Sequence, residues 1–152
     1  MIVRATDAAV VNFIANQPGV YGFIAPNPYS GEPIDLTECA ERPDHYVLLH
    51  NESCDGAMVF EWSGPGIWEM HTMFLPSCRG KKALEAGREM LAYMFDELEA
   101  FCIWGQTPRD LKAARLFNNH LGGRIVGEGE HYRFGACIHY RLTRDEWEER
   151  FR

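Results

Sequence analysis

The sequence predicts one α/β (α+β) domain in which a mixed, mostly antiparallel sheet is flanked by helices. Three observations predict this fold class. Between residues 45 and 75, apolar and polar residues alternate with a period of two, which is typical of strands. At Gly80 the period becomes about 3.6, which is typical of an amphipathic helix. An apolar segment at 101–105 follows that helix, and a strand–helix–strand unit implies one parallel crossover.

The first third of the chain combines a short strand, a helix and a long irregular segment. Residues 1–5 are predicted to form the strand, and the Thr-Asp pair that follows offers caps for a helix over 8–16. Residues 17–43 are rich in Pro, Gly and Asn, so we expect irregular structure with a turn of helix near 36–40. Segments of this length are commonly functional or mobile. A substrate lid and a packed surface loop both remain open as interpretations.

The middle of the chain predicts an antiparallel meander followed by a helix. Turn residues separate three strands, predicted at 45–50, 56–62 and 67–75. The helix then presents an apolar stripe made by Ala83, Leu84, Gly87, Met90, Leu91, Met94 and Phe95. This stripe predicts a helix that packs on the sheet.

The last third is predicted to add a second helix, two closing strands and a terminal helix. The second helix spans about 110–121 and ends at a Gly-Gly pair. The closing strands are expected at 124–126 and 132–142. Thr143, with Glu three residues later, has the spacing of a capping box and predicts the start of the terminal helix.

Composition limits the function classes. The 152 residues are 46% hydrophobic and 24% charged, which suits one globular domain over residues 1–152. The net charge of −7 argues against a nucleic acid or a membrane as the main partner. The five cysteines form no C-x-x-C pair, and no secretory segment or apolar run of about 20 residues is seen. The sequence therefore predicts a reduced, cytoplasmic protein.

The turn before the first long helix concentrates positive charge. Arg79, Lys81 and Lys82 surround Gly80, and no acid follows until Glu85. Cations are unfavourable at a helix N-terminus, which exposes free N–H groups and a positive dipole end. An external anion bound to those N–H groups would account for the arrangement, and a solvated basic turn is the alternative. The apolar strand that precedes the turn favours a phosphate site.

This stretch, FLPSCRGKKALEAGREMLAYMF, resembles the GCN5-related N-acetyltransferase (GNAT) family. In that family a strand leads into a turn of pattern Q/R-x-x-G-x-G/A, whose amides hold the pyrophosphate of acetyl-CoA. The chain departs from the pattern at Lys82 and Leu84, where Gly and Gly or Ala would be expected. The similar residues are Pro76, Arg79, Gly80 and Ala83.

A second motif of the family is also present in altered form. The family has Asn-x-x-Ala-x-x-x-Tyr on a helix, followed by Gly-Phe. Here Asp110, Ala113 and Phe117 occupy those positions, and Gly-Gly follows. The element order resembles the GNAT fold from end to end, most closely in small, divergent GNAT-like proteins carried by bacteriophages.

The resemblance implies acetyl-CoA as cosubstrate, lying between the strands at 67–75 and 101–105. Pantetheine amides would pair with backbone near Met73 to Leu75, and the pyrophosphate would lie on amides of Arg79 to Ala83. The residues so implied in cofactor binding are Met73, Phe74, Leu75, Arg79, Gly80, Lys81, Lys82, Ala83, Asp110 and Phe117.

Two residues of the 67–75 strand are catalytic candidates. Glu69 and His71 lie two apart and therefore share a face. By resemblance Glu69 would act as general base through water, and His71 could share that role because imidazole titrates near neutrality. A structural hydrogen-bonded pair, or a pair facing water, is the alternative. The six histidines have no metal-site spacing, so no metal is predicted.

The proton donor is missing from its expected place. GNAT enzymes commonly use the Tyr of the second motif, and Phe117 has no hydroxyl. Tyr132, His120, Tyr93 or solvent would have to replace it. The predicted function is an acetyl-CoA-dependent N-acetyltransferase acting on an unidentified primary amine, in a small molecule or a peptide. The alternative is a catalytically inactive GNAT-fold binding or assembly module, for instance a phage-encoded one. The acidic chain favours cationic acceptors, and a homodimer is compatible with the sequence.

Overall fold

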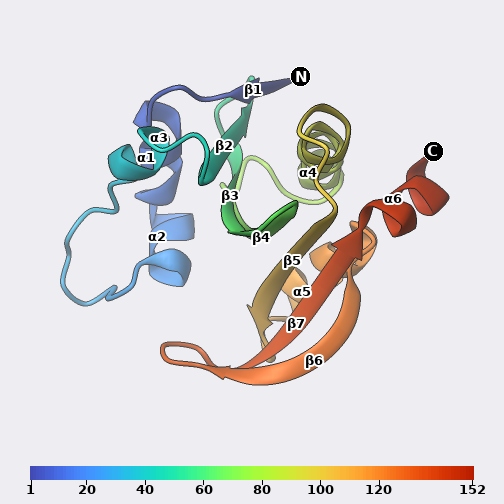
Figure 1. Cartoon of the computed structure of the whole chain (residues 1–152). Coiled ribbons are helices and arrows are strands. Elements are labelled where there is room, and N and C mark those ends of the chain that lie inside the picture. The colour runs from blue at the N-terminus through green and yellow to red at the C-terminus, as the bar shows by residue number, and fades with distance from the viewer.

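The computed structural model describes all 152 residues and shows a seven-stranded sheet with helices on both faces (Figure 1). The strands are β1 (Ile2–Arg4), β2 (Tyr46–Asn51), β3 (Gly56–Gly64), β4 (Ile67–Phe74), β5 (Cys102–Pro108), β6 (Arg124–His131) and β7 (Gly135–Thr143). The helices are α1 (Ala9–Ala15), α2 (Pro18–Ile24), α3 (Thr37–Ala40), α4 (Lys81–Ala92), the π-helix η1 (Tyr93–Glu97), α5 (Lys112–His120) and α6 (Arg144–Phe151).

The sheet is mixed and mostly antiparallel, as predicted. Its strand order is β1-β2-β3-β4-β5-β7-β6, and β4–β5 is the one parallel pair. The predicted β2-β3-β4 meander is confirmed, and α4 is the crossover that makes β5 parallel to β4.

The parallel pair is short, and this shapes the centre of the molecule. β4 and β5 pair only where 67–69 face 102–104. Beyond Glu69 and Trp104 each strand continues for several residues without pairing to the other. Gly105 still lies against β4, since a Cβ there would be 3.3 Å from the carbonyl oxygen of Met70. The two strands therefore diverge and leave backbone edges of the sheet unpaired at its centre.

Each face of the sheet covers its own apolar core. On one face α4, η1 and α6 cover a cluster that includes Phe60, Met90, Phe95 and Trp147. On the other face α1 and α2 cover a cluster that includes Val11, Ile14, Leu48 and Met73. The predicted apolar stripe runs through α4 and η1 and points into the first cluster, where Ala83, Met90, Leu91, Met94 and Phe95 are buried.

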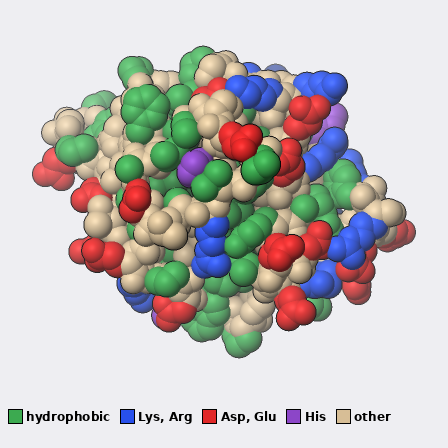
Figure 2. All heavy atoms as spheres, turned by 90° about the horizontal axis from the view of Figure 1, so that it is seen from above, with side chains coloured by type: hydrophobic (Ala, Val, Ile, Leu, Met, Phe, Trp, Pro, Cys, Tyr) green, Lys and Arg blue, Asp and Glu red, His purple; other side chains and the backbone are tan.

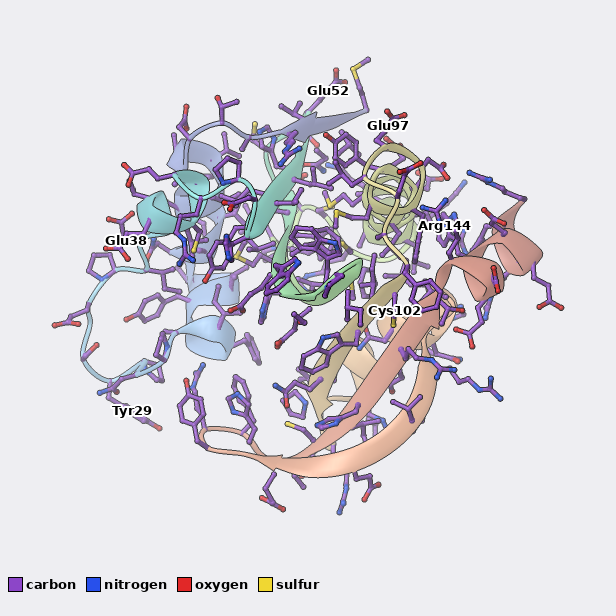
Figure 3. All side chains as sticks on the ribbon, viewed as in Figure 1. Tyr29, Glu38, Glu52, Glu97, Cys102 and Arg144 are labelled. Atoms are coloured by element: carbon purple, nitrogen blue, oxygen red, sulfur yellow. The ribbon has the colours of Figure 1, made fainter.

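The prediction of mostly irregular structure in 17–43 was wrong for its first part, where α2 forms. Pro18 stands in the first turn of α2, a position where its missing N–H costs nothing. The predicted turn of helix near 36–40 is confirmed as α3. The loop between α2 and α3 is held to α1 by side-chain amides: Asn16 Oδ1 accepts from the Ile34 N–H at 2.7 Å, and Asn12 Oδ1 accepts from the Leu36 N–H at 2.8 Å. The loop tip is open, because Tyr29 is 97% exposed and points outward (Figure 3).

The closing elements differ from prediction mainly in length. β6 extends to His131, whereas a strand over 124–126 was expected, because the glycines and acids after Val126 hide its period. The predicted helix at 110 begins two residues later, at Lys112. The capping box is confirmed: the Thr143 hydroxyl accepts from the Glu146 N–H at 3.3 Å, and Glu146 Oε2 accepts from the Thr143 N–H at 2.8 Å.

No helix of the structure has the length and apolarity that a membrane crossing requires. The face shown in Figure 2 carries acidic and basic side chains interspersed, with no broad basic surface. This distribution agrees with the acidic composition.

Candidate functional site

The turn between β4 and α4 leaves a helix N-terminus without an internal cap. The first backbone bond of α4 runs from the Leu84 N–H to the Gly80 carbonyl, so the N–H groups just before Leu84 have no partner within the helix. No side chain caps them, and the first turn of α4 contains no acid. Gly80 has φ 57° and ψ −129°, a conformation that only glycine adopts readily. The turn therefore presents free donors and a positive dipole end, as an anion site requires.

The three cations of the turn have different surroundings. Lys81 is 90% exposed and forms a 3.6 Å ion pair with Glu85 on the next turn of α4. Arg79 is exposed. Lys82 points back towards the β2–β3 turn, where its ammonium donates to Asp55 Oδ2 at 2.7 Å. Arg79 and Lys81 are therefore the cations open to an external anion, whereas Lys82 is already paired.

Asp55 is a site neighbour that sequence reasoning missed. Its side chain is only 10% exposed. Burial alone would raise the pKa of this carboxyl, but hydrogen bonds from Lys82, Asn51, Ser77 and Ser53 together hold it far below its ordinary value. Asp55 and Lys82 lie 27 positions apart on separate elements, so local spacing does not relate them.

At the end of β4, only one of the three predicted backbone positions, Met73 to Leu75, is open to a ligand. The Leu75 N–H donates to the Asp55 carbonyl at 2.8 Å, and the Leu75 carbonyl accepts from the Cys78 N–H at 2.8 Å. Met73 and Phe74 are buried and lie on the stretch of β4 that has left β5. Because Leu75 directs its N–H to the Asp55 side, the alternation of the strand directs the N–H and C=O of Met73 to β3 and those of Phe74 to the open side. Phe74, and not Met73 or Leu75, therefore has the backbone geometry that an added strand-like ligand needs.

The structure brings Glu69 and His71 together and adds a third residue, Glu61 on β3. His71 Nε2 lies 3.4 Å from Glu61 Oε2 and 3.6 Å from Glu69 Oε1. The Glu69 side chain is 17% exposed, whereas Glu61 and His71 are about half exposed. The hydrogen bond with His71 lowers the pKa of the Glu61 carboxyl, an effect that partial burial opposes. Glu61 therefore stays anionic near neutral pH.

Glu61 and Glu69 belong to a row of register partners that crosses the sheet. Tyr46 is the register partner of Glu61, Glu61 is the partner of Glu69, and Glu69 is the partner of Trp104. Glu69 and Trp104 are the last paired residues before β4 and β5 diverge. The period-two pattern of 56–62 placed Glu61 on a strand, but only the register shows that it faces Glu69. The three clustered groups have ligand atoms within 4.8 Å of one another and could also hold a cation.

The remaining candidates lie outside this cluster. Phe117, on α5, packs on Phe74. Asp110 is exposed in the turn before α5. The suggested proton donors are spread over the fold: Tyr93 in η1, His120 at the end of α5, and Tyr132 beyond β6, where it is 84% exposed. None of them belongs to the Glu61–Glu69–His71 cluster.

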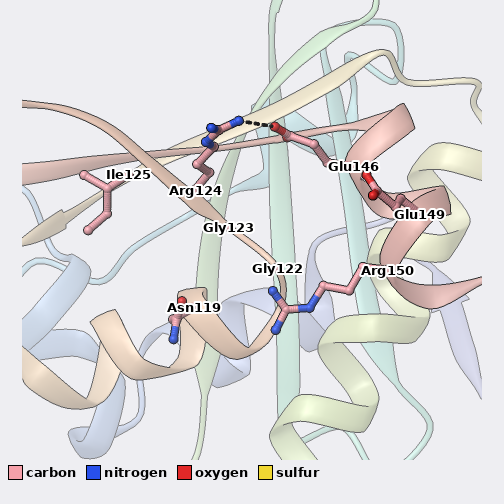
Figure 4. Close-up of a pocket in the computed structure, with 8 residues that line it drawn as sticks. All are labelled: Asn119, Gly122, Gly123, Arg124, Ile125, Glu146, Glu149 and Arg150. Atoms are coloured by element: carbon pink, nitrogen blue, oxygen red, sulfur yellow. Dashed lines mark hydrogen bonds and ion pairs between the residues drawn. The ribbon is translucent and has the colours of Figure 1, made fainter.

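A separate recess of about 500 Å³ lies between the end of α5, the start of β6 and α6 (Figure 4). Arg124 and Glu146 form a 3.4 Å ion pair across it, and Glu149 and Arg150 add one charge of each sign. Two arginines and two glutamates balance in formal charge, which gives this recess no marked preference for an anion or a cation. It contains none of the predicted site residues.

Comparison with known proteins relates the architecture to acetyltransferases. No protein-family model and no curated protein sequence matches the chain. A solved chimera of Vibrio cholerae spermidine N-acetyltransferase SpeG with hSSAT has a TM-score of 0.74 at 14% identity, covering 99% of this chain and 98% of its own. SpeG from Vibrio cholerae, solved in complex with manganese ions, has a TM-score of 0.71 at 13% identity, covering 100% and 96%.

A Bacillus anthracis acetyltransferase of the GNAT family has a TM-score of 0.58 at 15% identity, covering 73% of this chain and 74% of its own. These comparisons give no support to a bacteriophage connection. With the mixed sheet, the diverging β4 and β5 and the uncapped α4, they agree on one architecture. Over nearly its whole length, the chain has the fold of the GNAT acetyltransferases.

Proposed function

We propose that the chain is an acetyl-CoA-dependent N-acetyltransferase that acts on a primary amine. The observation that carries the proposal is the position of Glu69. It shares a cluster with His71 and is the last β4 residue paired to β5, where the two strands diverge. In this fold a ligand between the diverging strands would place its reactive end beside that cluster.

Acetyl-CoA would bind to the end of β4 and to the turn before α4, the two segments that the sequence predicts as its site. The diphosphate would accept from the N–H groups of Gly80 to Ala83, with Arg79 and Lys81 adding charge. The pantetheine would pair with the free backbone of β4 at Phe74. Phe117 and Asp110, at and before α5, would border the nucleotide side. Lys82 would act indirectly, through Asp55.

The reaction requires a neutral amine next to the thioester carbonyl. Glu69, directly or through water, would take a proton from the acceptor ammonium, and His71 would share that proton. The amine nitrogen then forms a bond to the carbonyl carbon and loses a second proton to solvent, and the carbon–sulfur bond breaks to release the CoA thiolate. Solvent would return a proton to the thiolate, because Phe117 has no hydroxyl.

The acceptor is proposed to be cationic in solution. Glu61 stays ionised beside the reacting position and provides a counter-charge for an ammonium group. The chain as a whole carries a net charge of −7, which attracts cations. The compared SpeG proteins are spermidine acetyltransferases, and a polyamine is one acceptor to include among the tested amines.

Calorimetry and a thiol-release assay test this function. The protein is titrated with acetyl-CoA, CoA and ATP, and CoA release is then followed with a panel of polyamines, aminoglycosides and lysine peptides. We expect binding of both CoA species in preference to ATP, and turnover with at least one amine. Glu69→Gln should lower kcat about 100-fold, the low end for loss of a general base. Glu85→Gln on exposed α4 surface is the matched control and should leave kcat unchanged. The absence of CoA binding at near-millimolar ligand would refute the proposal.

A second function is favoured by Phe117. Without a hydroxyl at that position, the chain could be a GNAT-fold binding or assembly module that holds CoA without transferring its acyl group. CoA binding with no thiol release for any amine would select this alternative.

A further inference from the structure

Asp55 lies next to the turn formed by residues 76–80 between β4 and α4, which we call the anion turn. Its side chain is hydrogen-bonded to residues on both sides of Gly80. One carboxylate oxygen, Oδ2, accepts from the Ser77 hydroxyl at 2.9 Å and from the Lys82 ammonium at 2.7 Å. The other, Oδ1, accepts from Asn51 Nδ2 at 2.8 Å and from the Ser53 hydroxyl at 3.0 Å. The carboxylate thus joins the β2–β3 turn to residues on either side of Gly80.

The same region is anchored through its backbone. The Asp55 carbonyl accepts from the Leu75 N–H, and Asn51 Oδ1 accepts from the N–H groups of Asp55 and Gly56 at 3.1 Å each. By contrast, the stretch from Cys78 to Gly80 includes a glycine with positive φ and no capping side chain. Within the turn, Cys78 is anchored, because it is buried and its N–H donates to the Leu75 carbonyl. Asp55 adds the bonds to Ser77 and Lys82, which flank the glycine of the turn.

We propose that Asp55 is a positioning residue for the CoA site: by holding Ser77 and Lys82, it keeps the N–H groups between them aimed at the diphosphate. This inference rests on the proposed function. If these N–H groups are already fixed in the free protein, their conformational entropy is not lost when the ligand binds. The affinity for CoA is therefore higher than it would be with a mobile turn. The Asp55–Lys82 pair also withdraws one lysine from the ligand, which leaves Arg79 and Lys81 as the cations that contact it.

The direction in which Asp55→Asn changes the affinity for CoA distinguishes a positioning role from a purely electrostatic effect. Asp55 is an anion close to a proposed anion site, so neutralising it would by charge alone tighten CoA binding. A positioning role predicts the opposite. We expect Asp55→Asn to weaken CoA binding about tenfold, the loss expected for one charge-assisted hydrogen bond. The KM for acetyl-CoA should rise equally, while the KM for the amine and kcat at saturation stay unchanged.

Two further variants complete the experiment. Ser77→Ala removes one hydroxyl bond to Asp55 without a change of charge, and should weaken CoA binding in the same direction by a smaller factor. Glu85→Gln neutralises an acid on the same helix that does not hold the turn, and should leave CoA affinity unchanged or tighter. Hydrogen exchange of the unliganded protein is a readout independent of CoA. In Asp55→Asn the hydrogen-bonded amides around the turn, those of Leu75, Cys78 and Leu84, should exchange faster, while those of the β3–β4 core do not.

The outcomes separate the two proposals. If the wild-type protein does not bind CoA, the proposed function fails and the role of Asp55 fails with it. If the wild-type binds, and Asp55→Asn binds equally well or more tightly, only the positioning role is overturned. If Asp55→Asn does not fold, Ser77→Ala decides, and an unchanged affinity for CoA in that variant overturns the role.

Discussion

The ring of Phe117 packs against the ring of Phe74, with centroids 5.3 Å apart and planes inclined by 59°. This contact joins α5 to the end of β4. The far end of the Phe117 ring faces α4, since its Cζ lies 3.1 Å from the position that a Cβ on Gly87 would occupy. Phe117 stands where the GNAT resemblance places a tyrosine. A hydroxyl on this ring would therefore be directed at the backbone of α4.

Phe117→Tyr should not improve catalysis, even though it restores the residue of the family motif. The added hydroxyl would enter an apolar contact with α4, at a cost of about 1–3 kcal/mol if it finds no partner. We expect a lower melting temperature and no rise in kcat at any pH. Thermal unfolding and a pH profile of thiol release are the measurements. A tenfold gain in kcat would contradict this prediction. It would show that the Tyr hydroxyl reaches the thioester and can donate a proton to the CoA thiolate from this position.

Gly80 is expected to be required for its backbone conformation as well as for the access it gives to a ligand. A Cβ at Gly80 meets no atom within 4 Å, so the cost of Gly80→Ala comes from the positive φ alone, about 1–3 kcal/mol. Gly80→Ala should lower the melting temperature and retain measurable CoA binding. Gly80→Glu carries the same strain plus a carboxylate in the anion site, and should abolish binding. The two variants are compared by calorimetry after both are shown to fold. Equal CoA affinities for the two variants would mean that no phosphate lies at this turn.

The elements that the sequence predicted well are those with strong periodicity. The α4 stripe and the Thr143–Glu146 capping box were visible because their signals lie within a few residues of one another. The α2 helix was hidden by two glycines and a proline in seven residues. Its formation depends on tertiary packing, in which Val20 is buried among residues of the sheet and α1.

The residues of the candidate site also divide into those that local sequence predicts and those that tertiary packing brings in. Glu69, His71 and the Arg-Gly-Lys-Lys turn belong to single elements and could be predicted. Glu61 joins the cluster through strand register, and Asp55 reaches Lys82 across 27 positions of the chain. Contacts of that kind depend on how separate elements pack, and local spacing does not encode them.

Acid should destabilise the protein in part through Asp55. Its folded-state pKa lies below the ordinary value of 3.8, so Asp55 contributes stability that is present above that value and is lost as pH falls through the folded pKa. Asp55→Asn should therefore melt below the wild type by a constant interval from about pH 8 to pH 5, and the interval should narrow below about pH 4. Thermal unfolding of both proteins across this range is the measurement. An interval that stays constant down to pH 2 would show that the charge of Asp55 is not the stabilising group.

Arg133, in the turn between β6 and β7, holds the end of α2. Its guanidinium donates to the Gly22 carbonyl at 2.6 Å and to the Phe23 carbonyl at 3.2 Å. A cation at a helix C-terminus is favourable both for the dipole and for the unpaired carbonyls. Near the start of the same helix, a Cβ at Gly19 would lie 3.0 Å from the ring of Pro76, which begins the anion turn. Thus α2 connects the anion turn to the β6–β7 turn.

Loss of this contact should loosen α2 selectively. Arg133→Ala removes two hydrogen bonds, each contributing about 0.5–1.5 kcal/mol, and should speed hydrogen exchange in residues 18–24. Arg133→Lys keeps the charge but lacks the planar fork that reaches both carbonyls, so it should recover only part of the protection. Arg42→Ala, which removes a guanidinium 5.7 Å from the Tyr46 ring, is a control at a site distant in sequence. If α2 exchanges at the same rate in Arg133→Ala and in the wild type, α2 is held by its apolar face alone. If exchange is faster throughout the protein, the substitution destabilises the whole fold.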